Sequence, residues 1–153
     1  MSGLGQPAIF VRAGSAEDDS FIERLAAQAF TEYARYPGRS TLEMARTGRT
    51  WIVERAGSRL GFAVVHGAGA ARAELCAIAV AEAARGTGVG AALLERVELD
   101  LARAGTRELG LHTAEANASA LDLFVKRGFA VERQLPRFYR GVFDACAMRK
   151  RIA

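Results

Sequence analysis

Histidine and cysteine are scarce in this chain of 153 residues, which has two of each. Cys76 and Cys146 lie far apart and form no CxxC pattern, so the sequence predicts neither a disulfide framework nor a metal site. We expect both to be buried thiols in a reducing compartment, by default the cytoplasm.

Long apolar runs are also lacking. No segment approaches the roughly 20 apolar residues that cross a bilayer, and residues 1–10 lack the basic and apolar regions of a secretory signal. We therefore expect no membrane association. With only three prolines, and no internal repeat or low-complexity linker, the sequence predicts a single domain over 1–153 with its core at about 8–151.

No large excess of one charge is present. The 21 Lys and Arg against 17 Asp and Glu leave a formal net charge of +4. Most basic residues are interleaved with acidic ones along the chain, as in Glu23-Arg24 and Glu95-Arg96, and the exception is the run at 149–151. Without a long basic stripe or stacking aromatics, we expect no nucleic-acid ligand. A small positive excess suits a polyanionic small molecule equally well.

A glycine-rich turn is the most informative feature that is present. Apolar residues at 75–80 predict a central strand, and the sequence RGTGVG at 85–90 follows, ahead of an amphipathic helical pattern. Three alternate glycines leave backbone N–H groups uncovered, and a helix that begins there adds unpaired amides and the positive end of its dipole. With Arg85 beside it, this turn predicts a site for phosphate oxygens.

Two familiar phosphate motifs fit this turn poorly. A P-loop requires Lys and then Ser or Thr after its last glycine, whereas two alanines follow here. The dinucleotide fingerprint is matched only loosely, by Gly86, Gly88 and Ala91 with Glu108 about 20 residues further on. A nucleotide-binding oxidoreductase and a turn that serves packing alone therefore remain as alternatives.

Strand and helix patterns alternate along the rest of the chain. Strands are expected at 9–11, 51–54, 60–66, 75–80, 109–112, 129–133 and 143–148, and helices at 15–30, 41–47, 89–104 and 117–127. A capping box at Ser15 and Asp18 begins the first helix, and the first hairpin turns at 56–58. Pro37-Gly38 breaks a predicted loop at 31–39. This order predicts a mixed α/β sheet covered by helices.

Two motifs give a family resemblance. The pattern R-x-x-G-x-G/A at 85–90 resembles the pyrophosphate-binding motif of the GNAT family, the acetyl-CoA-dependent N-acetyltransferases. The segment NASALDLFVKRGFA at 117–130 resembles the family's N-x-x-A-x-x-[LF]-[YF]-x-x-x-G-F stretch, and the resemblance spans 9–151. It looks closest in kind to the acetyltransferases that modify the N-terminal alanine of ribosomal proteins. It implies a single GNAT-like domain with a mostly antiparallel sheet and helices on both faces.

The resemblance also implies acetyl-CoA as the cosubstrate. Its pantetheine arm would lie along the strand at 78–80 and form a hydrogen bond with Asn117. Phe124 would lie beside the thioester sulfur. Asn117 is equally expected to cap the helix that follows it. The residues implied to bind the cofactor are Ile78, Ala79, Val80, Arg85, Gly86, Thr87, Gly88, Val89, Gly90, Ala91, Asn117 and Phe124.

The implied reaction is direct attack of a primary amine on the thioester. An alkylamine is mostly protonated at pH 7, so a base must remove its proton. His112 occupies a position where the alanine acetyltransferases look to carry a glutamate, and Glu74 begins the central strand; these are the two candidates. An ordinary structural position is the alternative for each, and His66 is expected to be structural only.

The sequence departs from the family at the general acid. The usual tyrosine is replaced by Phe124, which has no hydroxyl. Tyr33, Tyr36 and Tyr139 fall on predicted loops that border the acceptor side, and we predict that Tyr139 substitutes, unless it only lines the substrate site. The same departure leaves open a non-catalytic acyl-CoA-binding sensor or interaction module. The acceptor, a small-molecule amine or a peptide N-terminus, and a possible homodimer are not determined.

Overall fold

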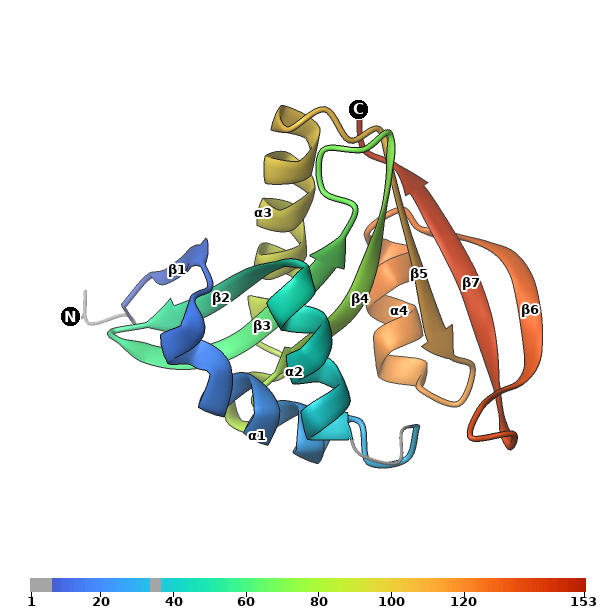
Figure 1. The fold of residues 1–153 in the computed structure, drawn as a ribbon, viewed down its shortest axis with the longest axis horizontal. Helices are drawn as coiled ribbons and strands as arrows, with labels where there is room; N and C mark the ends of the chain where they lie inside the picture. Colours follow the sequence, from blue (N-terminus) through green and yellow to red (C-terminus); the bar gives the residue numbers. More distant parts are fainter. Residues whose placement is uncertain (1–6, 34–36) are drawn as a thin grey trace.

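One mixed sheet of seven strands organises the computed structural model, which describes residues 7–33 and 37–153 (Figure 1). The strands are β1 (Ile9–Ala13), β2 (Arg49–Arg55), β3 (Ser58–His66), β4 (Arg72–Val80), β5 (Glu108–Ala114), β6 (Ala130–Tyr139) and β7 (Phe143–Arg151). The helices are α1 (Asp19–Ala29), α2 (Pro37–Thr47), α3 (Val89–Arg103) and α4 (Ala118–Lys126), with short 3-10 turns at Ala16–Asp18 and Glu82–Ala84.

The strand order is β1-β2-β3-β4-β5-β7-β6, and every neighbouring pair is antiparallel except β4 with β5. The predicted α/β class with a mostly antiparallel sheet is therefore confirmed. Each predicted strand and helix is present, and most of them extend a few residues beyond the predicted bounds.

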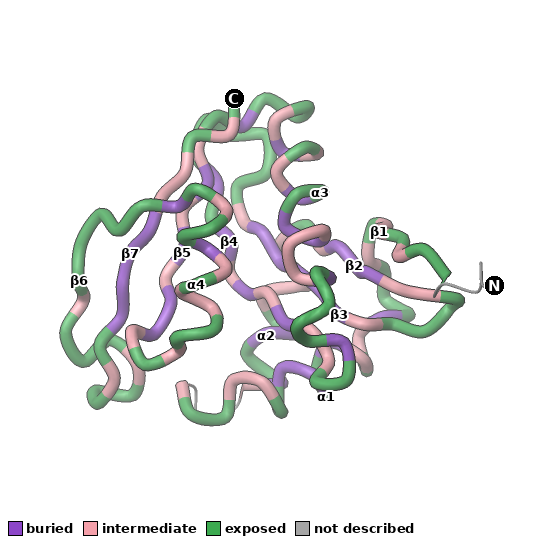
Figure 2. Tube along the Cα trace, turned by 180° about the vertical axis from the view of Figure 1, so that it is seen from behind, coloured by how far each residue is buried: buried purple, intermediate pink, exposed green. Residues whose placement is uncertain are grey.

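Helices cover both faces of the sheet because successive strand residues point to opposite faces. On β2, Trp51 belongs to the core cluster that includes Leu93 of α3, whereas its neighbour Ile52 belongs to the cluster that includes Ile22 of α1. All four side chains are buried. Figure 2 shows that burial concentrates on the central strands and the inner helix faces, while the edge strand β6 is largely exposed.

One polar contact fastens α3 to the sheet. The indole Nε1 of Trp51 donates a hydrogen bond of 2.9 Å to Oδ2 of Asp100 on α3, and Arg96 donates to the same oxygen at 3.2 Å. A buried indole N–H requires such a partner. The contact matters for the site because the glycine-rich turn leads directly into α3.

Two predicted boundaries are wrong. Pro37 does not break a loop but is the first residue of α2, where the missing proline N–H has no helical partner to lose. A Cβ on Gly38 would lie 2.6 Å from the carbonyl oxygen of Glu23, so the glycine permits α2 to approach α1 closely. The last hairpin is longer than predicted, and Tyr139 ends β6 instead of lying on a loop. Tyr36 lies outside the described residues.

A fully buried carboxylate fixes the start of the first helical segment. The predicted capping box is present, with the Ser15 N–H donating to Oδ2 of Asp18 at 2.9 Å. Arg12 of β1 donates to both carboxylate oxygens at 2.8 and 2.9 Å, and Arg59 of β3 donates at 2.7 Å. These hydrogen bonds, those from Arg12 above all, hold the pKa of Asp18 well below its usual range.

We expect Asp18→Asn to lower the free energy of unfolding by about 3 kcal/mol at pH 7, because it removes the shared anion of two guanidinium groups. Since folding depresses the pKa of Asp18, its contribution is complete above the unfolded-state pKa and is lost as the pH falls. The difference between wild type and variant should therefore shrink below about pH 4. Urea unfolding followed by the fluorescence of Trp51 measures both quantities.

Asp19→Asn is the matched control. Asp19 pairs with the exposed Arg46 at 3.6 Å, and an exposed pair contributes only about 0.5 kcal/mol. Equal losses for the two variants, or a difference that does not change with pH, would contradict a structural role for the buried carboxylate.

Candidate active site

The single parallel strand pair opens the sheet at its centre. β4 and β5 are paired only from Arg72 with Glu108 to Leu75 with Leu111. Beyond Leu75, the described part of the chain pairs β4 with β3 alone, and the two strands diverge (Figure 1). The edge of β4 that faces the opening therefore presents backbone N–H and C=O groups to an extended ligand.

A cavity of about 650 Å³ adjoins this opening. It is bordered by residues 78–80 at the end of β4, by the glycine-rich turn and by α4. Gly86 and Gly88 have φ of +74° and +84°, a conformation that side chains rarely adopt, and a Cβ at either would meet nothing within 4 Å. The space in front of the turn is therefore open.

The N-terminus of α3 faces the same cavity. Gly88 is the N-cap, so the N–H groups of the next three residues have no partner within the helix. The Nε of Arg85 donates to the Val80 carbonyl at 3.1 Å, which leaves its two terminal nitrogens for a ligand. Unpaired amides, a helix dipole and a guanidinium are the groups with which proteins commonly bind anions.

Ten of the twelve residues predicted to bind the cofactor line this cavity. The two exceptions are Thr87, whose hydroxyl donates to the Ala84 carbonyl within the turn, and Val89, whose side chain is buried in the core. Either residue is therefore able to contribute only backbone atoms to a phosphate ligand.

Asn117 and Phe124 lie where the cavity meets α4. The Asn117 side chain accepts a 3.2 Å hydrogen bond from the Ala120 N–H, which confirms that it caps α4. Phe124 is buried, and its ring packs edge-to-face against Phe129 at a centroid distance of 5.7 Å.

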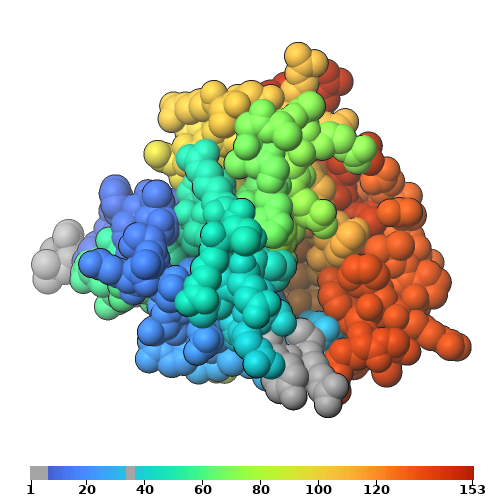
Figure 3. Space-filling model, viewed as in Figure 1, coloured from blue at the N-terminus to red at the C-terminus, as the bar shows by residue number. Residues whose placement is uncertain are grey.

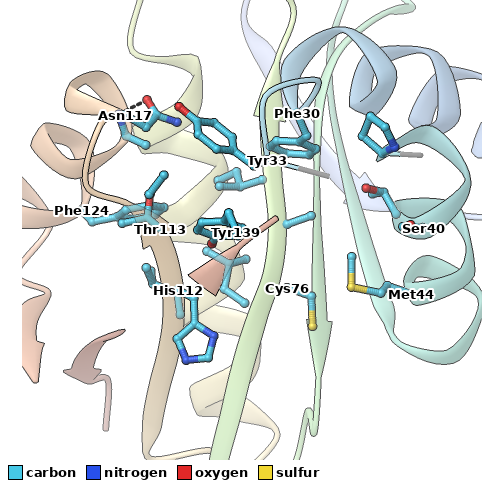
Figure 4. Close-up of a pocket in the computed structure, with 18 residues that line it drawn as sticks. Phe30, Tyr33, Ser40, Met44, Cys76, His112, Thr113, Asn117, Phe124 and Tyr139 are labelled. Atoms are coloured by element: carbon cyan, nitrogen blue, oxygen red, sulfur yellow. Dashed lines mark hydrogen bonds between the residues drawn. The ribbon is translucent and has the colours of Figure 1, made fainter. Parts of the chain in front are cut away.

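A second cavity, of about 190 Å³, adjoins the first. It lies between α2, the opening of the sheet and the β6–β7 hairpin, and Figure 3 shows the hollow at the surface between these segments. Its walls are mainly aromatic and apolar, as Phe30, Tyr33, Met44 and Tyr139 illustrate (Figure 4). Residues that line both cavities are Phe30, Tyr33, Ile78, Asn117, Ala120 and Phe124.

The structure brings the two predicted bases together. His112 of β5 lines the second cavity, and its Nδ1 lies 3.4 Å from Oε1 of Glu74 on β4. The ring of His112 also packs edge-on against Phe138 at 5.0 Å. The strand register, which pairs Glu74 with Gly110, sets this proximity, and nothing in the local sequence indicated it.

Tyr139 lines the second cavity but not the first. Burial, with smaller effects of Tyr33 and Glu74, raises its pKa to about 12, so its hydroxyl keeps its proton at neutral pH. The expectation that Cys76 is a buried thiol is wrong: it is half-buried and lines this cavity, whereas Cys146 is buried as predicted.

Other candidate residues have structural surroundings. The Nε2 of His66 lies 3.0 Å from the Met44 carbonyl and 3.2 Å from Oγ1 of Thr47, so His66 links β3 to α2. Within residues 7–33 and 37–153, no three His, Cys, Asp or Glu side chains gather into a metal site. No helix in that part of the chain is long and apolar enough to cross a membrane. Phe30 and Met44 were not predicted, since their helical spacing indicates only core.

Comparisons with known proteins agree with this geometry. The model of the acetyltransferase (GNAT) family matches residues 16–129. Ard1 from Thermoplasma volcanium is 26% identical over 95% of this chain and 99% of its own, with a TM-score of 0.84. The ribosomal-protein-S18-alanine N-acetyltransferase from Escherichia coli is 21% identical over 95% of both chains, with a TM-score of 0.80.

A third similar structure is yncA from Salmonella typhimurium, solved with its cofactor acetyl-CoA. It is 19% identical over 95% of both chains, with a TM-score of 0.81. No curated protein matches the chain.

Proposed function

The chain belongs to the GNAT family of acetyltransferases, and on that basis we propose that it transfers the acetyl group of acetyl-CoA to a primary amine. The observation that carries the proposal is the meeting of two cavities at the divergence of β4 and β5. One cavity has an anion site and the other has a candidate base. Their junction allows both substrates to react directly in a ternary complex.

The residues of the first cavity suit coenzyme A. The amides at the start of α3 and the guanidinium of Arg85 match its diphosphate, while the unpaired edge of β4 matches the amides of its pantetheine arm. Asn117 offers a further polar contact at the junction. When bound there, the cosubstrate supplies an activated acetyl thioester.

His112 and Glu74 together remove the proton of the amine. His112 takes the proton directly or through one water, and Glu74, 3.4 Å away, orients the ring and stabilises the imidazolium that forms. The N–H groups on the open edge of β4, which have no β5 partner beyond Leu75, stabilise the charge that develops on the acetyl oxygen. No covalent intermediate on the protein is needed.

We assign the second cavity to the acceptor and call it the acceptor cavity. It favours an amine with a compact apolar or aromatic body. Its walls include Phe30, Tyr33 and Met44, which bind such a group by burial and ring contacts, and its volume is about 190 Å³. A small arylalkylamine and a peptide with an apolar N-terminal residue both fit this description. The free thiols of Cys76 and Cys146 favour a reducing compartment such as the cytoplasm.

A panel of amines tests the activity. We expect thiol release from acetyl-CoA with 2-phenylethylamine to exceed that with spermidine by at least about 10-fold in kcat/KM. Burial of its apolar ring contributes about 1.5–3 kcal/mol, and about 1.4 kcal/mol corresponds to a factor of ten. An alanine-initiated peptide is the second acceptor of the panel. Tight binding of acetyl-CoA without thiol release for any amine would instead support the non-catalytic sensor.

Gly88→Ala tests the anion site. A methyl group in front of the amides should weaken acetyl-CoA binding at least about 10-fold, measured by calorimetry, because the backbone no longer approaches the phosphates. Gly57→Ala is the control: Gly57 has a similar φ of +81° and open space around it, but it lies in the β2–β3 turn. Both variants should lose about 1 kcal/mol of stability, and equal effects on binding would contradict the assignment.

His112→Gln tests the base. We expect kcat/KM to fall about 10²-fold at neutral pH, because the amine loses its general base. Glu74→Gln should cause a smaller loss, since it leaves the imidazole of His112 in place. A kcat/KM unchanged by His112→Gln would remove His112 as the base.

A further inference from the structure

The roles assigned above include no group that protonates the leaving thiolate. As the amine attacks, the thiolate of coenzyme A leaves at the junction of the two cavities. The side chains there from α4 are Ala120 and Phe124, and neither carries a hydroxyl. A tyrosine that supplies this proton must reach the junction from another element.

Tyr33 is the one tyrosine among the described residues that lines both cavities; Tyr139 lines only the acceptor cavity. Tyr33 lies in the turn after α1, and Figure 4 shows its hydroxyl directed toward Asn117. Asn117 also lines both cavities, so the hydroxyl faces the junction.

The ring of Tyr33 is held on several sides. Its backbone N–H donates to the Phe30 carbonyl at 3.1 Å. Its ring packs against the ring of Tyr139 and, in a T-shaped arrangement, against the ring of Phe143, each at a centroid distance of 5.5 Å. Aromatic packing of this kind fixes the ring while leaving the hydroxyl at its far end. Burial and the neighbouring carboxylate of Glu32 raise the pKa of Tyr33, so it is protonated at neutral pH.

We propose that Tyr33 is the general acid of the transfer, an inference that rests on the proposed acetyltransferase activity. The amine nitrogen forms the C–N bond to the acetyl carbon, the C–S bond breaks with its electron pair on sulfur, and the proton of the Tyr33 hydroxyl moves to that sulfur. The tyrosinate regains a proton from solvent. The ammonium nitrogen loses two protons, one before it attacks and one from the tetrahedral adduct, and both leave through His112. The sum is amide, free thiol and one proton for each ammonium consumed.

The general acid then lies in the turn after α1, whereas the usual tyrosine of the family falls on α4, at the position of Phe124. The same side chain then forms a wall of the acceptor cavity and contacts the β6–β7 hairpin, so the acceptor site and the proton donor are assembled together.

Tyr33→Phe tests the proposal because it keeps the ring contacts and removes only the hydroxyl. With 2-phenylethylamine or the alanine-initiated peptide as acceptor, kcat should fall about 10²-fold, while the Kd for acetyl-CoA stays within about twofold of wild type, a change of at most about 0.4 kcal/mol. The matched variant Tyr139→Phe should lose less than about tenfold in kcat. Adding Phe124→Tyr to Tyr33→Phe should restore at least about tenfold by returning a hydroxyl to the junction from α4.

A Tyr33→Phe variant with the kcat of wild type would overturn the proposal, as would an equal or larger loss in Tyr139→Phe. The test separates this inference from the proposed function. If wild type releases no thiol with any amine, the acetyltransferase activity itself fails; if wild type turns over and Tyr33→Phe matches it, only the assignment of the acid fails.

Discussion

The early end of parallel pairing between β4 and β5 is the constraint on which the site depends. Pairing stops at Leu75 with Leu111, and past that point the hydrogen-bonding groups on one edge of β4 are available to a ligand inside the sheet. Soluble proteins usually leave unpaired strand edges at the periphery, where charge or proline protects them. Here the open edge lies at the centre, between two cavities, and the proposed function places the meeting of an extended cosubstrate and an acceptor there.

The rest of the fold keeps this opening in place. Helices α1 and α2 pack on one face of the sheet, and α3 and α4 pack on the other. Their packing buries both faces of the sheet outside the region where β4 and β5 diverge. The bond from Trp51 to Asp100 positions α3, and hence the amides at its start. The carboxylate of Asp18 joins β1, β3 and the first helical segment through Arg12 and Arg59. Rigid elements therefore present the reacting groups, as precise positioning requires.

Signals confined to a few consecutive residues were predicted well. The glycine-rich turn at 85–90, the cap at Asn117 and the capping box at Ser15 each depend on backbone geometry that neighbouring residues impose. Predictions failed where a distant segment decides the outcome. Pro37 begins a helix because α1 supports it, Tyr139 extends a strand because β7 pairs with it, and Cys76 is half-buried because β5 diverges from its side.

The sequence by itself determined the order of strands and helices, the family and the glycine-rich turn before α3, because periodicity and glycine spacing act through local backbone conformation. Only the tertiary structure decided which side chains share the two cavities. Glu74 reaches His112 through strand register, and Tyr33 reaches the junction with Asn117 although the two residues lie far apart along the chain. Such contacts arise from the packing of distant elements, which no local pattern encodes.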